Sequence, residues 1–123
     1  MIEHNIQVDH DLQIIFVVVS GIITEDDYKG VSGKVWALST ELSYHAFYDL
    51  VDTRFTFTVD VSARLPREIS EKSSPNAKNS RVALLVNPRD YSKWKFIEMI
   101  NHGMGFKTRP FMNKEDAMAW LFS

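Results

Sequence analysis

Hydrophobic residues along the chain form short runs near the N-terminus and helical stripes further on. Ile6 and Val8 make a first run, and residues 12–21 (LQIIFVVVSG) make a second one after His10-Asp11. This arrangement predicts a β-hairpin with its turn at the two polar residues. The second run is continuous and β-branched, which is typical of a strand that is covered on both faces.

The next segment has the pattern of an amphipathic helix. Thr24 is followed directly by acidic residues. This predicts a helix start, because threonine caps free amides and carboxylates favour the positive end of the helix dipole. From there apolar side chains recur at helical spacing and predict one stripe that faces the core. Its members are Tyr28, Val31, Val35, Leu38 and Leu42.

The rest of the chain alternates hydrophobic strands with helices. Strands are expected at 46–52, 81–87 and 108–112, and helices at about 62–72, at 88–104 and after Asn113. Gly103 and Gly105 are the expected stop signal of the helix at 88–104. The order is ββαβαβαβα, an α/β fold with a mixed, largely parallel sheet and helical cover, because parallel neighbours need crossover connections. With 123 residues, the chain is expected to be one domain over 1–123.

Composition and charge narrow the classes of function. The formal net charge is -2 and the basic residues are scattered, so no nucleic-acid partner is expected. The sequence has no cysteine, which excludes disulfides, thiolate metal sites and a cysteine nucleophile. The longest apolar run, Ile14–Val19, is too short for a transmembrane segment, and the N-terminus lacks the basic start of a signal peptide. We therefore expect a cytoplasmic protein.

The chain lacks sequence motifs for metal binding or nucleophilic catalysis. Its 4 histidines do not have the spacing of a helical zinc site, and there is no Gly-x-Ser-x-Gly elbow or Ser-His-Asp spacing. We expect no catalytic residue, no metal and no cofactor. A hydrolase whose triad assembles only in space stays open as a third class of function.

A polar segment follows the third expected strand. Asp52 ends that strand, and Asp60 and Ser62 stand where the chain should enter the next helix. The simplest interpretation is that Asp60 or Ser62 caps this helix. The alternative is a phosphorylation switch, because a helix N-terminus also stabilises the charge of about -1.5 to -2 that a phosphate on Ser62 would bring. The carboxyl ends of strands in such sheets are also where ligands and partners usually bind.

Over its whole length the chain resembles the SpoIIAA-like branch of the STAS family, the anti-sigma factor antagonists and their relatives. In that family a buried strand ends in Asp, and an Asp-Ser-Ser-Gly turn follows. Asp52 and Asp60 match the two acids, and the phosphorylated serine falls at Ser62, whereas Val61 and Ala63 replace the first serine and the glycine. Further motifs that resemble the family are Gly103-Met104-Gly105-Phe106, Arg109-Pro110-Phe111 and Ala117-Met118-Ala119-Trp120-Leu121.

The resemblance implies a non-enzymatic regulatory domain that docks to a protein partner, in the best-known branch a serine-kinase anti-sigma factor. It places the docking surface at the helix after the third strand. The candidate partner-binding residues are Asp52, Asp60, Ser62 and Arg64, with Ser62 as the candidate phosphorylation site. The partner is then a regulatory kinase or another protein, or a second copy of the chain in a homodimer.

Surplus apolar side chains support an alternative function. The apolar arc of the helix at 88–104 is wider than one packed face requires, and Trp36 lies beside the stripe of the first helix. These side chains either cover the edges of the core, form an exposed interface or line a groove. The candidates are Trp36, Tyr91, Trp94, Met99 and Met104. Because the fold also resembles the lipid-binding Sec14 domains, the alternative is a carrier or sensor of a small hydrophobic ligand or lipid.

Overall fold

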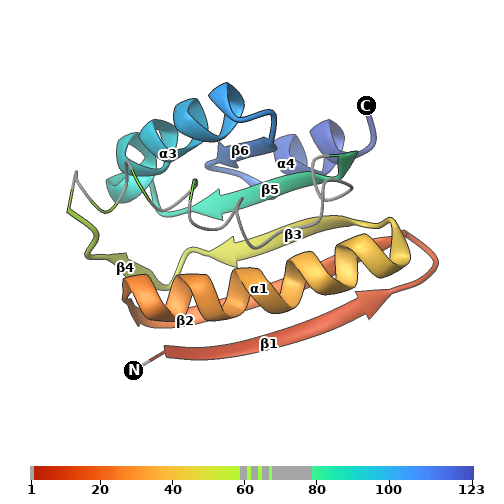
Figure 1. The fold of residues 1–123 in the computed structure, drawn as a ribbon, viewed down its shortest axis with the longest axis horizontal. Helices are drawn as coiled ribbons and strands as arrows, with labels where there is room; N and C mark the ends of the chain where they lie inside the picture. Colours follow the sequence, from red (N-terminus) through yellow and green to blue (C-terminus); the bar gives the residue numbers. More distant parts are fainter. Residues whose placement is uncertain (1, 59–60, 62–63, 65–66, 68–78) are drawn as a thin grey trace.

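The chain begins with the expected hairpin. In the computed structural model, which describes residues 2–58, 61, 64, 67 and 79–123, strands β1 (Ile2–Asp9) and β2 (Ile14–Ile23) pair antiparallel (Figure 1). The turn is closed by the carboxylate of Asp9, which accepts a hydrogen bond from the amide of Leu12 at 2.9 Å. Gln13 completes the reversal in a left-handed conformation, with φ 58°. The predicted hairpin is confirmed.

The sheet continues from β2 through parallel neighbours. β2 pairs with β3 (His45–Leu50), β3 with β5 (Arg81–Val86), and β5 with β6 (Lys107–Phe111), so the order is β1-β2-β3-β5-β6. Crossover helices make the parallel pairing possible. They are α1 (Glu25–Leu42) between β2 and β3, and α3 (Tyr91–Gly103) between β5 and β6. The predicted fold class, α/β with a largely parallel sheet, is confirmed.

A short strand that the sequence pattern did not predict extends the sheet. We expected one strand over 46–52, but β3 ends at Leu50 and a turn at 51–52 leads into β4 (Thr53–Phe55). β4 pairs in parallel with the end of β2, where Gly21 opposes Thr53. The reason is the length of β2: it runs past β3 and presents free backbone groups there, which β4 satisfies.

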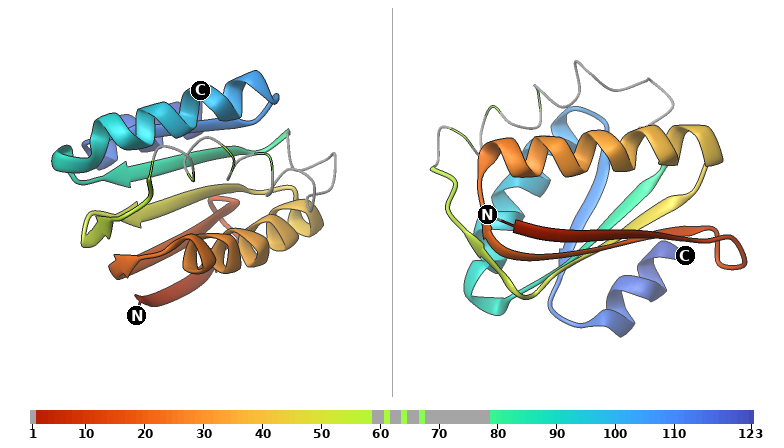
Figure 2. Two further views of the ribbon diagram at one scale, coloured as in Figure 1. Left: turned by 60° about the vertical axis from the view of Figure 1, so that its left-hand side comes forward. Right: turned by 90° about the horizontal axis from the view of Figure 1, so that it is seen from below.

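Helices cover the two faces of the sheet unequally. α1 and α3 pack on one face and share one core with it, whereas α4 (Lys114–Leu121) packs on the other face over β5 and β6. Figure 2 shows α1 and α4 on opposite sides of the sheet. No helix in the described part of the chain is long and apolar enough to cross a membrane.

The first helix begins as its sequence predicts. The Thr24 hydroxyl accepts a hydrogen bond from the amide of Asp27 at 3.2 Å, and the carboxylate of Asp27 accepts one from the amide of Thr24 at 3.2 Å, which is a capping box. Tyr28, Val31 and Val35 of the predicted stripe are buried, whereas its last two members are half-buried.

The second expected helix, at about 62–72, lies almost entirely outside the described residues. Val61, Arg64 and Arg67 are described there, and all three are helical. The helix expected at 88–104 is divided into a 3-10 turn, η2 (Pro88–Asp90), and α3. As expected, the glycines end it: Gly105 adopts φ 87°, which an L side chain rarely adopts.

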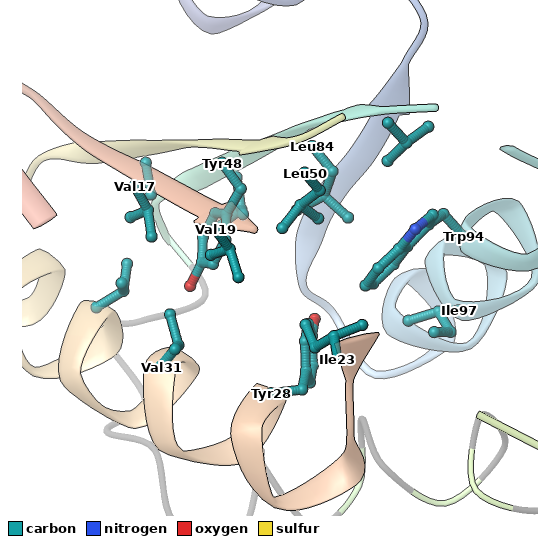
Figure 3. Packing of buried hydrophobic residues seen from close by; sticks show 14 of the residues in the cluster. Val17, Val19, Ile23, Tyr28, Val31, Tyr48, Leu50, Leu84, Trp94 and Ile97 are labelled. Atoms are coloured by element: carbon teal, nitrogen blue, oxygen red, sulfur yellow. The ribbon is translucent and has the colours of Figure 1, made fainter. Parts of the chain in front are cut away.

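Trp94 belongs to the centre of the core. It is one of the surplus apolar candidates from the sequence, but it is 1% exposed and contacts the rings of Tyr28, Phe55 and Phe57. Figure 3 shows Trp94 and Ile97 of α3 converging with Tyr28 of α1 over the sheet. Phe55 and Phe57 come from β4 and the residues after it, so the strand that the pattern missed supplies the surface on which Trp94 packs.

One half of the sheet has a bare face, contrary to the expectation that β2 is covered on both sides. Val17 and Val19 are buried under α1, but Val18 is 52% exposed and Ile22 is 51% exposed on the opposite face. α4 covers that face over β5 and β6 and reaches only the start of β2, where Ile14 is buried. The rest of β2 is left open together with β1 and β4. The continuous apolar run is therefore a strand with one buried and one partly exposed side.

Candidate functional site

The carboxyl ends of the parallel strands bring several loops to one edge of the sheet. The start of α1 follows β2, the turn at 51–52 follows β3, and residues 87–90 follow β5. The arrowheads of β3 and β5 point to the same side in Figure 1, and β2 runs parallel to β3. We call this group of loops the carboxyl edge. Ligands and partners of open α/β sheets usually bind at such an edge.

Asp52 is presented at the carboxyl edge by a fixed turn. Its carbonyl oxygen accepts a hydrogen bond from the amide of Gly21 at 3.1 Å, and Gly21 has the left-handed φ of 105°. Thr53 donates its hydroxyl to the carbonyl oxygen of Leu50 at 2.6 Å. Because its backbone is fixed on both sides while Asp52 itself is exposed, its carboxylate is available to a partner.

The loop after β5 is tied to this turn and to β4. Asn87 donates from its side-chain amide to the carbonyl oxygen of Val51 at 3.5 Å, and Arg89 donates to that of Thr53 at 3.3 Å. Asp90 accepts a hydrogen bond from the amide of Phe55 at 3.4 Å and is only 3% exposed. These contacts make the carboxyl edge one connected structure instead of separate loops.

Asp90 was not identified from the sequence as a site residue. Its buried carboxylate is balanced by two cations, Arg89 at 3.6 Å and Lys93 at 3.9 Å. Paired charges of this kind are the form in which buried carboxylates are tolerated. The only sequence signal was its place four residues after the end of a buried strand, in the Asn87-Pro88-Arg89-Asp90 segment.

Arg64 reaches the carboxyl edge through Glu25, in the first turn of α1. Two guanidinium nitrogens bind the two carboxylate oxygens, Nη1–Oε1 at 2.6 Å and Nη2–Oε2 at 3.0 Å. Lys29 lies 3.1 Å from the same carboxylate. Hydrogen bonds from Arg64, and then from Lys29, hold the pKa of Glu25 below its ordinary value of 4.5. Asp60 and Ser62, the other two candidate partner-binding residues, lie outside the described residues.

The five candidates for a hydrophobic site differ in their exposure. Trp94 is buried, whereas Met99 is 63% exposed. Trp36 is half-buried and packs on Phe106 with ring centroids 5.4 Å apart, and Tyr91 and Met104 are also half-buried. The structure therefore makes Trp94 a core residue and leaves Met99 as the candidate with the most exposed side chain.

A small polar cavity lies under Trp36. It is lined by Tyr28, Ser32, Trp36, Tyr48, Val82, Asn101, Phe106 and Thr108 and measures about 20 Å³. That volume has room for one water molecule, whereas pockets for drug-sized ligands measure about 300–1,000 Å³. Burial raises the pKa of Tyr28 to about 12 and also raises the pKa of Tyr48, while hydrogen bonds to Ser32 oppose both shifts.

A second polar cluster, not identified from the sequence, lies at the opposite, amino end of the sheet. Ser39 donates to the carbonyl oxygen of Tyr44 at 2.7 Å and lies 2.8 Å from the hydroxyl of Ser80. His45 accepts a hydrogen bond from the amide of Arg81 on its Nδ1 at 2.9 Å. Burial, together with the charges of Arg81 and Lys107, lowers the pKa of His45 below 6.5. Its Nδ1 is thus engaged with the backbone.

Among the residues that the structure describes, no group of three or more His, Cys, Asp or Glu side chains is placed to hold a metal ion.

Comparison with known proteins gives one family match and several structural neighbours. A family model described as SpoIIAA-like matches residues 14–122. The chain is similar to the crystal structure of an anti-sigma factor antagonist from Mycobacterium paratuberculosis, with 19% identity, a TM-score of 0.60, and coverage of 100% of this chain and 96% of that one. No curated protein matches the sequence.

A second neighbour is an uncharacterized protein of the DUF3478 family with a SpoIIAA-like fold from Shewanella loihica PV-4. It has 18% identity and a TM-score of 0.58, with coverage of 98% of this chain and 93% of that one. At these identities the two neighbours establish the fold.

Proposed function

Because the chain belongs to the SpoIIAA-like family, we propose that it is a regulatory protein-interaction domain without catalytic activity. Its partner docks at the carboxyl edge of the sheet, over Asp52, Arg64 and the segment with Asp60 and Ser62. One structural neighbour is described as an anti-sigma factor antagonist, a description that implies a protein partner. A regulatory kinase is the class of partner that this likeness favours.

The observation that carries the proposal is the fixed geometry of the carboxyl edge. Asp52 is exposed on a turn whose backbone is bonded to Gly21, and Arg64 is exposed while its guanidinium is held by Glu25. Charged side chains on a rigid frame lose little conformational entropy when a partner binds them, which favours their use in recognition. The edge therefore offers one acid and one base in defined positions.

Ser62 is the proposed site of regulation by phosphate. It is two residues from Arg64 in the sequence. A phosphate would add about -1.5 to -2 charges to the docking surface and would attract nearby cations. Such a charge would alter the electrostatic potential around Arg64 and Glu25, and with it the surface that a partner recognises.

Affinity capture with purified variants tests the docking surface. Wild type, Asp52→Lys and Glu41→Lys are used as baits in native lysate; Glu41 is an exposed acid near the far end of α1 and provides a matched charge change. We expect one protein to be captured by wild type and by Glu41→Lys but not by Asp52→Lys. Equal capture by all three would place the docking surface elsewhere.

The same preparation separates the proposal from the carrier of a hydrophobic ligand. Native mass spectrometry of the wild-type protein is expected to give the mass of the bare chain or a multiple of it. A co-purified lipid, together with no captured protein, would favour the carrier. The cavity of about 20 Å³ under Trp36 does not have the volume for a lipid chain.

A further inference from the structure

The bare half of the sheet has a defined composition. Its centre is apolar, with Val18 and Ile22 each about half exposed and Phe16 beside them. Alternation along the paired strands adds side chains on both flanks of β2. Glu3 and Asn5 of β1 lie on one flank, and Asp49 of β3 and Arg54 of β4 lie on the other. We call this surface the open face.

The open face is bounded on one side by helix α4. α4 packs on the same side of the sheet but over β5 and β6, with Met118 partly buried against the apolar cluster that includes Phe16. A second sheet packed on the open face would lie about 10 Å above it, in the layer that α4 occupies. On the other side the sheet ends at β1, whose outer edge has no neighbouring strand among the described residues.

The register gives the two flanks complementary groups, one pair at the same level along β2 and one pair two residues apart. Asn5 and Asp49 both stand opposite Val18, one on each side of β2. Further along, Glu3 stands opposite Ser20 and Arg54 opposite Ile22. Neither Glu3 nor Arg54 has an ion-pair partner among the described residues. The acid Glu3 on one flank is thus complementary to the base Arg54 on the other, and the amide of Asn5 is complementary to the carboxylate of Asp49.

We propose that a second copy of this chain packs on the open face, related by a two-fold axis that runs along β2. This rotation exchanges the flanks and keeps each residue at its level along β2, so Asn5 meets the partner's Asp49 directly. Glu3 lies about 6.6 Å along the strand from the partner's Arg54, a distance that the long arginine side chain spans. Each contact occurs twice. Val18 and Ile22 pack against their own copies in the centre. The rotation also places the free edge of each β1 beside α4 of the other copy, which covers an edge that would otherwise be exposed.

The size of the open face sets the expected affinity. From a strand spacing of about 4.8 Å and a rise of about 3.3 Å per residue, the open part measures roughly 20 by 15 Å. This is about 300 Å² of sheet surface, to which the side of α4 adds, whereas a standard specific interface buries about 800 Å² per partner. The contact is therefore of the small, weak class. We expect a dimer with a dissociation constant in the micromolar range.

Sedimentation equilibrium of the purified chain from about 1 to 500 µM tests the pairing. Val18→Lys should raise the dissociation constant about 100-fold or more, because it buries two unpaired charges at the centre. Met99→Lys changes another exposed apolar residue, on α3 and on the other side of the sheet, and should leave the dissociation constant unchanged. Wild type that stays monomeric up to 500 µM would overturn the proposal.

Charge reversal tests the specific pair. Glu3→Arg alone and Arg54→Glu alone should each raise the dissociation constant about tenfold, because each places like charges together. The double reversal should return it to within about threefold of wild type. If the double variant is as weak as the singles, the orientation is wrong. The measurement uses the isolated chain, so its outcome is independent of partner docking at the carboxyl edge.

Discussion

Arg64 binds the carboxylate of Glu25 with two guanidinium nitrogens, at 2.6 Å and 3.0 Å, although the residues are 39 positions apart. Bidentate pairs of this kind combine charge with fixed geometry. The pair joins the first turn of α1 to the segment that follows β4. It therefore fixes the place where the candidate docking segment meets the rest of the fold.

Loss of this pair should loosen the segment without unfolding the protein. In Glu25→Gln we expect faster amide hydrogen exchange around residues 61–67 and little change in Tm, because the carboxylate is at the surface and the pair contributes little to global stability. Asp26→Asn, at the exposed neighbouring acid, is the control. Unchanged exchange in Glu25→Gln would mean that other contacts hold the segment.

The same pair gives a pH dependence of defined sign. Arg64 and Lys29 lower the pKa of Glu25 in the folded state, so folding favours the charged carboxylate. The stabilisation that the charged Glu25 carboxylate gives to the folded state is therefore present above the ordinary pKa of 4.5 and is lost as the pH falls below it. Hydrogen exchange at residues 61–67 should rise between pH 5 and about pH 3 in wild type, after correction for the intrinsic rates, and the rise should be smaller in Glu25→Gln.

Trp94 should be one of the most costly residues to truncate. Trp94→Ala is expected to lower the free energy of unfolding by about 3–5 kcal/mol, because it leaves a cavity among Tyr28, Phe55 and Phe57. Urea unfolding followed by circular dichroism measures the change. Met99→Ala, on the exposed side of the same helix, should stay within about 0.5 kcal/mol of wild type. Similar losses in the two variants would contradict the assignment of Trp94 to the core.

His45 should make the protein less stable in mild acid. Its pKa is lowered below 6.5 in the folded state, so the unfolded chain binds the proton more readily and stability falls as the pH drops from about 7 towards 5. His45→Asn retains an acceptor for the amide of Arg81 but does not titrate, and should flatten this part of the curve.

Tyr28 and Tyr48 should remain protonated when the solution is strongly alkaline. Burial raises both pKa values above 10, that of Tyr28 to about 12. The folded state then holds protons that the unfolded state releases, so stability is complete below pH 10 and declines above it. Absorbance at 295 nm at pH 11 should show both tyrosines un-ionised in the folded protein, and their ionisation should appear together with unfolding. Titration of all 4 tyrosines in folded protein would refute this.

Much of the fold could be predicted from local pattern. The hairpin, the cap at Thr24 and the stripe on α1 follow from side-chain periodicity and from the backbone groups that a helix end leaves free. The family resemblance, drawn from the terminal motifs and the order of elements, is confirmed by the SpoIIAA-like match over 14–122. These features depend on residues close together in the sequence.

The features that sequence reasoning missed depend on residues far apart. β4 is three residues long and exists because the end of β2 needs a partner. Trp94 is buried because β4 and the residues after it supply the aromatic rings of Phe55 and Phe57 to pack against it. The exposed side of β2 could not be predicted, because a continuous apolar run does not show how far a helix covers the sheet. Asp60 and Ser62 lie outside the described residues, so their roles stay predictions.

β4 has a consequence for how the two proposed associations relate. Within this strand Arg54 faces the open face, and Asp52 precedes the strand directly, in the turn at the carboxyl edge. The backbone between Asp52 and Arg54 is hydrogen-bonded to β2. A shift of this backbone when a partner binds at the carboxyl edge therefore also moves Arg54 at the open face. The two associations are thus thermodynamically linked: if the partner prefers one oligomeric form, the oligomeric form must by reciprocity alter affinity for the partner by the same factor. The concentration of this chain would then alter its affinity for the partner, because it determines the fraction of the chain that is dimeric.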